Sequence, residues 1–215
     1  MATLGLRLVG LHGLPASGKD TICDHLLSTF SNTKRIAFGD MLRNELSQEF
    51  DIKFDNMLAR SKDTELSHVT WSWFPREIRE RYGRPSKEYL TYRDLMRIYG
   101  TDYRRKQDVD YWLNKWRHEV NILPEGTCIV APDVRFANEC DLFMQHGVML
   151  RVNSTIDVGV KPHPSDSLLP RYHFDINGRG LQDVHTTCQH AVEACKTQEF
   201  VLNDKIKELN IYENN

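Results

Sequence analysis

The chain has 215 residues, of which 40% are hydrophobic and 27% charged, a size that suits one substantial domain and is short for two independent enzymatic domains. The formal net charge of −2 excludes a bulk attraction to nucleic acid or acidic membranes, so any anion-binding site must be local. Five widely spaced cysteines without a CxxC pair argue against a disulfide framework or zinc site, and the lack of a long apolar run or secretory leader favours a cytoplasmic protein without a membrane partner.

The first third of the chain alternates between strand-like and helix-like segments. Residues 6–12 are rich in aliphatic side chains without alternation, as in a central parallel strand that is covered on both faces. Apolar residues then recur every four positions over 22–30, which predicts a helix with one buried face. Residues 34–38 predict a second strand, and Asp40 is placed to cap the helix that follows.

The middle of the chain has a looser pattern. Polar residues, aromatic clusters and a turn-like segment over 51–90 predict an inserted, mainly helical lobe for binding a substrate. Residues 89–99 follow helical spacing and predict a helix that ends at Gly100. A further helix is expected over 109–120, where apolar residues again share one face.

The last third returns to alternating elements. Strands are expected at 127–131 and 148–152, with a helix over 138–145 between them. This alternation predicts a three-layer α/β fold with a parallel central sheet, as one domain over residues 1–215. A connection over 155–180, which carries three prolines, predicts a lid or binding loop.

One Gly-rich segment joins the first expected strand to the first expected helix, and it runs from Gly13 to Asp20. Gly13 and Gly18 allow the backbone to curl so that successive N–H groups point at phosphate oxygens. Lys19 adds a cation for the β- and γ-phosphates, and the helix N-terminus attracts negative charge. The segment is therefore a predicted P-loop, and the predicted ATP-binding residues are Gly13, Ala16, Ser17, Gly18, Lys19, Asp20 and Thr21.

Two carboxylates are candidates for a magnesium site. Asp20 stands where a P-loop usually carries Ser or Thr, so either Asp20 or Thr21 positions Mg²⁺, or Asp20 only caps the helix. Asp133 follows a buried strand at the edge of the sheet where ligands bind, and it is either a second metal-orienting carboxylate or a helix cap. Arg135, two residues later, can offer a bidentate fork to a phosphate.

Five segments in order make the chain resemble the bacteriophage-type deoxynucleoside monophosphate kinases, a P-loop kinase family. They are GLPASGKDT at 13–21, FGDMLR at 38–43, GTDYR at 100–104, DYW at 110–112 and DVRFANE at 133–139. The resemblance spans roughly residues 6–180, and an aspartate after the P-loop lysine also occurs in that family. It implies Mg²⁺-dependent transfer of the ATP γ-phosphoryl group to a deoxynucleoside monophosphate (dNMP), which yields dNDP and ADP. It also implies a homodimer, and the host-cell cytoplasm if the protein is viral.

Such a transfer depends mainly on positioning and charge neutralisation, because the acceptor phosphate is already an anionic nucleophile. The candidate catalytic residues are Lys19, Asp133 and Arg135, and the candidate metal ligands are Asp20 and Asp133. The candidate dNMP-binding residues are Asp40, Arg43, Arg97, Arg104, Arg135, Asn138 and Glu139. The candidate lid residues are His163, Ser165 and Arg171; the segment HPSD at 163–166 resembles the family's HxSE, with Asp in place of Glu.

Two other functions stay open. Related loops with GKD occur in other small-molecule P-loop kinases, such as those that phosphorylate phosphomevalonate. The chain is alternatively a P-loop ATPase or nucleic-acid-binding module, because aromatic and basic residues interleave from Trp71 to Arg93 and could stack bases. The simpler account of these aromatics is a small satellite core, and the near-neutral charge argues against nucleic acid as a partner.

Overall fold

The chain folds into two compact units, Met1–Ala37 with His118–Asn215, and Phe38–Arg117. The computed structural model describes residues 3–5, 7–57, 65–82, 89–153, 171–177 and 184–213. Within these residues, no helix combines the length and apolar character needed to cross a membrane.

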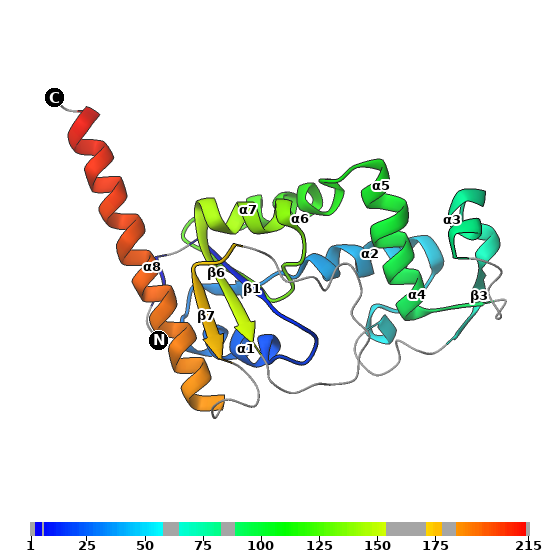
Figure 1. Cartoon of the computed structure of the whole chain (residues 1–215), viewed down its shortest axis with the longest axis horizontal. Helices are drawn as coiled ribbons and strands as arrows, with labels where there is room; N and C mark the ends of the chain where they lie inside the picture. Colours follow the sequence, from blue (N-terminus) through cyan, green and yellow to red (C-terminus); the bar gives the residue numbers. More distant parts are fainter. Residues whose placement is uncertain are drawn as a thin grey trace. The chain divides into compact units, whose positions relative to one another are not determined.

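The first unit is built on a five-stranded sheet in which every neighbouring pair of strands is parallel, in the order β2-β5-β1-β6-β7 (Figure 1). The strands are β1 Leu8–His12, β2 Thr33–Arg35, β5 Cys128–Ala131, β6 Gly147–Asn153 and β7 Phe174–Asn177. Every residue of β1 and β5 is buried, as expected for parallel strands covered on both faces. The predicted α/β fold with a parallel central sheet is thereby confirmed.

Helices cover both faces of this sheet (Figure 1). They are α1 Lys19–Thr29, α7 Ala137–His146 and α8 Val184–Glu213. Val9 and Leu11 of β1 pack in one core with α1 and α8. Gly10, between them, faces α7, since a Cβ there would lie 2.8 Å from the Phe143 ring. Successive strand residues point to opposite faces, so α7 covers one face while α1 and α8 cover the other.

The second unit combines helices with a small antiparallel pair of strands. Its helices are α2 Phe38–Phe50, α3 Arg76–Arg81, α4 Tyr92–Arg97, the π-helix η4 Ile98–Arg104, α5 Arg105–Gln107 and α6 Tyr111–Asn121, which begins in this unit. The strands are β3 Glu65–Thr70 and β4 Tyr89–Thr91, and the 3₁₀ turns are η1 Phe54–Met57 and η3 Trp71–Trp73. The segment 51–90 therefore contains a strand pair beside its helical turns, which the sequence did not indicate.

Gly100 does not end a helix, contrary to the prediction for residues 89–99. The chain passes from α4 through η4 into α5 with Gly100 in its interior. A Cβ on Gly100 would lie 3.0 Å from Leu42 of α2, and the Gly100 carbonyl accepts a hydrogen bond from Trp112 Nε1 at 2.9 Å. The glycine serves close packing here, so its usual role as a helix terminator is overridden.

Two further boundaries differ from the predictions. The second strand is β2 and α2 already begins at Phe38, so Asp40 lies in the first turn of α2 and is not its cap. Part of the predicted lid over 155–180 is a strand: residues 174–177 form β7, which pairs in parallel with β6. The other residues of that segment, apart from 171–173, lie outside the described residues.

Candidate phosphate-binding site

The loop that follows β1 adopts backbone conformations that favour glycine. Gly13 and Gly18 have φ angles of 157° and 103°, and Ala16 has a φ of 60°, values that L side chains rarely adopt. A Cβ on Gly13 would lie only 2.2 Å from the carbonyl oxygen of Val152 in β6. Glycine at position 13 thus lets the loop begin directly against the neighbouring strand.

The ammonium group of Lys19 folds back onto this loop. Its Nζ donates to Gly13 O at 2.8 Å, to Leu14 O at 2.6 Å and to Ser17 Oγ at 3.3 Å. Lys19 opens α1, whose N-cap is Gly18 and has no side-chain cap. The first N–H groups of α1 and the lysine charge are therefore both available at the loop, an arrangement that favours bound phosphate.

Asp20 lies in the first turn of α1 with an exposed side chain, and Thr21 beside it is also exposed. Because the N-cap is Gly18, the interpretation of Asp20 as the helix cap is wrong. A carboxylate in the first turn still interacts favourably with the positive end of the helix dipole. Because the Asp20 side chain is exposed, its carboxylate oxygens are also accessible to a cation that accompanies a bound phosphate.

Asp133 follows β5, the strand that pairs with β1 on the side away from β6. The next residue, Val134, is tied to the end of β1 by both of its backbone polar groups. Its N–H donates to Leu11 O at 3.1 Å, and its carbonyl oxygen lies 2.7 Å from His12 Nδ1. The turn that carries Asp133 is therefore anchored to the two residues that precede the P-loop.

Asp20 and Asp133 act on the same buried thiol, that of Cys23 in α1. Burial raises the pKa of Cys23 to about 12; Arg35 opposes this shift, and the negative charges of Asp24, Asp20 and Asp133 add to it. The two predicted metal ligands thus lie within electrostatic range of one side chain. Asp20 lies in the helix that follows β1 and Asp133 in the turn that follows β5, and these two strands are neighbours in the sheet.

The charges of three cations act on the pKa of His12. Burial lowers its pKa, the hydrogen bond to Val134 opposes this, and the positive charges of Lys19, Arg135 and Arg151 lower it further. Arg151 lies beside His12 in the register of β6 with β1. Sequence reasoning missed Arg151, which occupies an ordinary strand position outside every motif.

Arg151 of β6 is itself held in place by residues of and beside the neighbouring edge strand β7. Its guanidinium pairs with Asp175 of β7 through two hydrogen bonds of 2.5 and 2.7 Å. The same guanidinium lies over the Tyr172 ring, 3.9 Å from its centroid. Hydrogen bonds from Arg151 lower the pKa of Asp175 despite an opposing effect of burial. This pairing fixes the third cation of the site.

The remaining residues of the DVRFANE segment shape the start of α7. Glu139 is 1% exposed, and its Oε2 accepts hydrogen bonds from the N–H groups of Arg135 at 2.9 Å and Phe136 at 3.2 Å. This gives Glu139 a structural role, because the first N–H groups of a helix lack intrahelical partners. Helix α7 has Phe136 as its N-cap, so Asp133 does not cap it. The Arg135 side chain is exposed and that of Asn138 is half-buried.

No family model matches the chain. A protein of Acanthamoeba polyphaga mimivirus described as "Putative deoxynucleotide monophosphate kinase" is 22% identical over 165 residues, which cover 74% of this chain and 80% of that protein. The crystal structure of TT1252 from Thermus thermophilus is similar with a TM-score of 0.47 and 14% identity, covering 88% of this chain and 95% of that one. The mimivirus relative is named for the class of enzyme that the sequence motifs resemble.

The second unit contains four of the predicted dNMP-binding residues. Arg43 NH1 pairs with Asp40 Oδ1 at 2.6 Å, and its guanidinium lies over the Phe54 ring at 5.9 Å. The Arg43 side chain is only 15% exposed, and its buried Nε–H finds no hydrogen-bond partner among the described residues. Arg97 is exposed, and its positive charge opposes the rise in the pKa of Tyr82 that burial and Asp102 cause.

Arg104 lies in a cage of three tyrosine rings. Its guanidinium carbon is 5.1 Å from the ring centroids of Tyr99 and Tyr111 and 5.2 Å from that of Tyr103. Arg104 Nε donates to Glu45 Oε1 at 2.7 Å, and its NH2 donates to the Tyr99 hydroxyl at 2.8 Å. The orientation of this arginine is therefore set by its neighbours within the unit.

Glu45 of α2 is the common acceptor of this cluster, which sequence reasoning missed. Its Oε1 accepts from the Tyr99 hydroxyl at 2.6 Å, and its Oε2 accepts from the Tyr111 hydroxyl at 2.8 Å and from Lys115 Nζ at 2.7 Å. Burial raises the pKa of Glu45, but the hydrogen bonds from Lys115, Tyr99 and Tyr111 outweigh it and leave the pKa lowered. Glu45 is thus an ionised carboxylate that organises Arg104 and Lys115.

The predicted lid is only partly described. His163 and Ser165 lie outside the described residues. Arg171 pairs with Asp141 of α7, and its carbonyl oxygen accepts a hydrogen bond from Cys140 Sγ at 3.3 Å. The structure therefore holds Arg171 against α7.

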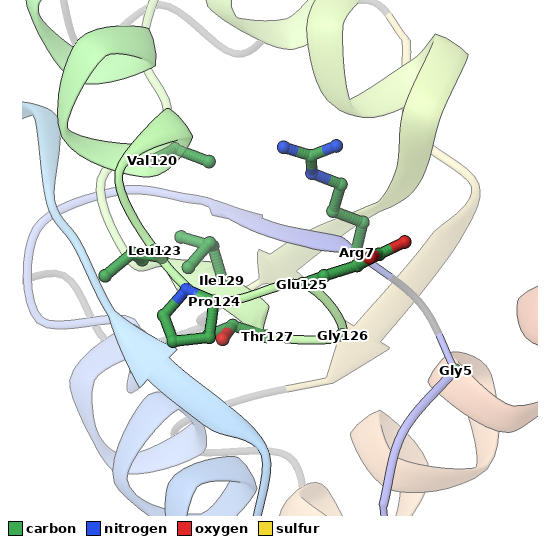
Figure 2. A pocket seen from close by; sticks show the side chains of 9 residues that line it. All are labelled: Gly5, Arg7, Val120, Leu123, Pro124, Glu125, Gly126, Thr127 and Ile129. Atoms are coloured by element: carbon green, nitrogen blue, oxygen red, sulfur yellow. The ribbon is translucent and has the colours of Figure 1, made fainter.

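A cavity of about 410 Å³ opens at the opposite edge of the same sheet (Figure 2). Its lining includes Arg7, just before β1, and Thr127, just before β5, so it lies at the amino ends of these strands. Leu123 and Ile129 contribute apolar surface to it. None of the predicted site residues lines this cavity.

Proposed function

We propose that this protein is a nucleotide kinase that transfers the ATP γ-phosphoryl group to a deoxynucleoside monophosphate. The observation that carries the proposal is the candidate P-loop, where Lys19, the first turn of α1 and two glycines with positive φ angles come together. The Asp133 turn, which is bonded to the same strand, supports a metal-dependent transfer. The name of the mimivirus relative supports the acceptor class.

The first unit binds ATP, the phosphoryl donor. The loop N–H groups and Lys19 hold the β- and γ-phosphates, and Lys19 exchanges its bonds to Gly13 and Leu14 for bonds to phosphate oxygens. Asp20 and Asp133 fit Mg²⁺, because carboxylate oxygens suit this hard cation and the two residues follow neighbouring parallel strands, β1 and β5. When bound, Mg²⁺ neutralises charge on the transferring phosphoryl group.

The described residues hold no group of three or more His, Cys, Asp or Glu side chains that could bind a metal by themselves. Two carboxylates without a complete protein cage agree with Mg²⁺, which usually keeps several waters and binds through substrate phosphates. Thr21, next to Asp20, adds a hydroxyl at the same end of α1. These residues would position the ion, and the triphosphate would complete its coordination.

The acceptor half requires cations, since a phosphate monoester must approach the triphosphate against mutual repulsion. Arg43 is the strongest candidate because its buried Nε–H needs an acceptor and Asp40 fixes its orientation. Arg97 and Arg104 add charge in the same unit. Arg135, together with the half-buried Asn138, lies on the turn after Asp133 in the first unit.

A panel of dNMPs and NMPs with ATP and Mg²⁺, read by coupled ADP release, tests the proposal. We expect ADP release that depends on a dNMP, and a loss of at least about a hundredfold in Lys19→Ala. Lys34→Ala, which removes an exposed lysine of β2, serves as the control. Turnover with phosphomevalonate alone, or without any acceptor, would contradict the proposal and support the other small-molecule kinase or the ATPase.

A further inference from the structure

His12 is the last residue of β1 and immediately precedes the P-loop glycine Gly13. It is 3% exposed, and its Nδ1 lies 2.7 Å from the carbonyl oxygen of Val134. A carbonyl oxygen only accepts hydrogen bonds, so the Nδ1 of His12 carries the proton and donates it. A buried imidazole thus bonds the P-loop strand to the turn after the neighbouring strand.

The partner of His12 lies between two predicted catalytic residues. Val134 is 1% exposed, with Asp133 before it and Arg135 after it. Its N–H is bonded to Leu11 O at 3.1 Å, a backbone contact that any side chain at position 11 would allow. The bond to its carbonyl oxygen, in contrast, depends on the side chain of His12. Two bonds on either side of one residue restrict both translation and rotation of the turn.

We propose that His12 is a positioning residue that holds the Asp133–Arg135 turn in register with the P-loop, so that Asp133, Arg135 and Lys19 act on the same phosphoryl group. This inference rests on the proposed phosphoryl transfer. The geometry supports it because β1 ends in the loop that carries Lys19 while β5 ends in the turn that carries Asp133. His12 is the side chain that links these two ends at 2.7 Å.

The surroundings of His12 suit a neutral donor. Lys19 of α1, Arg135 of the turn and Arg151 of β6 are positive groups that act on the His12 ring. Burial and these charges lower the pKa of His12. A second proton would place a positive charge on a buried ring, so the neutral form with the proton on Nδ1 is favoured.

Two substitutions separate the hydrogen bond from the volume of the side chain. In His12→Asn, the amide nitrogen takes the place of Nδ1 and keeps a donor toward Val134. In His12→Leu, the volume is similar and the donor is lost. The measurements are kcat and KM for ATP and dNMP, together with the affinity for ATP in the presence and absence of Mg²⁺. Circular dichroism confirms folding, and His185→Leu, an exposed histidine on α8, is the control.

We expect His12→Leu to lower kcat by about tenfold or more, because a buried carbonyl is left without its donor and the turn shifts. The affinity for ATP without Mg²⁺ should change by less than about threefold, since the loop itself is intact. His12→Asn should keep kcat within about threefold of the wild type. Should His12→Leu fail to fold, His12→Gln replaces it, because its amide extends beyond the Nδ1 position.

Unchanged kcat in folded His12→Leu would overturn the inference, and so would an equal loss in His12→Asn and His12→Leu. If the wild type transfers phosphoryl groups to no dNMP, the proposed function fails. In that case the positioning role of His12 is tested by the effect of Mg²⁺ on the affinity for ATP. The inference requires His12→Leu to lose this effect and His12→Asn to keep it, and any other pattern contradicts it.

Discussion

Replacing Glu45 by glutamine removes the negative charge at the centre of the second unit while keeping nearly the same shape. Glu45 accepts hydrogen bonds of 2.6 to 2.8 Å from Tyr99, Arg104, Tyr111 and Lys115. The amide of glutamine keeps one oxygen, but its NH₂ group must face either Tyr99 with Arg104 or Tyr111 with Lys115. At least one cation therefore loses its acceptor.

A hydrogen bond to a charged group contributes about 1.5–3 kcal/mol to stability. The side chains of Arg104 and Lys115 are 24% and 43% exposed, so water replaces part of the lost interaction. Breaking a fully buried ion pair costs about 3–5 kcal/mol, which sets an upper limit. We expect the free energy of unfolding of Glu45→Gln to fall by about 2–3 kcal/mol, or roughly 5–10 °C in Tm for a chain of this size.

Chemical and thermal denaturation, followed by circular dichroism, measure this loss. Glu49→Gln is the matched control, because Glu49 is exposed one turn further along α2, and its free energy of unfolding should change by less than about 0.5 kcal/mol. If Glu45→Gln is as stable as Glu49→Gln, the cluster does not hold the unit together. The reasoning about a charged carboxylate at its centre would then be refuted.

The loss of stability caused by Glu45→Gln should depend on pH. The folded-state pKa of Glu45 is lowered, so its contribution to stability is fully present above its ordinary pKa of 4.5. The contribution is lost as the pH falls through that value toward the lower folded-state pKa, because the unfolded state then binds more protons. The stability difference between the wild type and Glu45→Gln should therefore narrow below about pH 4.5. A difference that widens on acidification would contradict the assignment.

Three further predictions concern the loop, the core and the thiols. Gly13→Ala should abolish saturable ATP binding in calorimetry, because its Cβ would lie 2.2 Å from Val152 O; near-normal affinity would disprove this loop geometry. Trp112→Phe should lower the free energy of unfolding by about 0.5–1.5 kcal/mol in denaturant titrations, since the Gly100 carbonyl loses the hydrogen bond from Trp112 Nε1 and keeps the one from Arg105 N–H; an unchanged midpoint would contradict it. A thiol reagent at pH 8 should label the native protein only slowly and the unfolded protein fully, because every cysteine is buried and burial raises the pKa of each thiol. Rapid labelling of the native protein would contradict this prediction. These thiols are Cys23, Cys128, Cys140, Cys188 and Cys195.

The parallel sheet could be predicted from sequence because its central strands are continuous apolar segments. β5 and the first part of β6 are buried on both faces, so their composition alone distinguishes them from helices with one polar face. β7 escaped prediction because only Ile176 of its four residues is fully buried. Its pairing with β6 is a tertiary contact that a short, mostly polar segment does not encode locally. The strand pair β3–β4 escaped for the same reason.

The candidate site shows the same division between local and distant interactions. The candidate P-loop could be predicted because its glycines, lysine and helix start are contiguous in the sequence, so this part of the candidate site depends on local geometry. Glu45 looked like an ordinary solvated helix residue, since its partners Tyr99 and Tyr111 lie 54 and 66 positions away. His12 resembled any strand residue, because its partner Val134 is 122 positions distant. A single sequence carries no signal for pairings at such separations.

The π-helix η4 sets the angle between the side chains near its two ends. In an α-helix each residue advances by about 100°, so Tyr99 and Arg104, five positions apart, would point roughly 140° away from each other. The wider turn, in which Arg105 N–H bonds to Gly100 O, brings positions five apart onto one side, and both side chains reach Glu45. The extra residue in the π-helical turn thus rotates Arg104 toward the side on which Tyr99 lies. Its loss would turn Arg104 away from the carboxylate without changing any residue in the cluster.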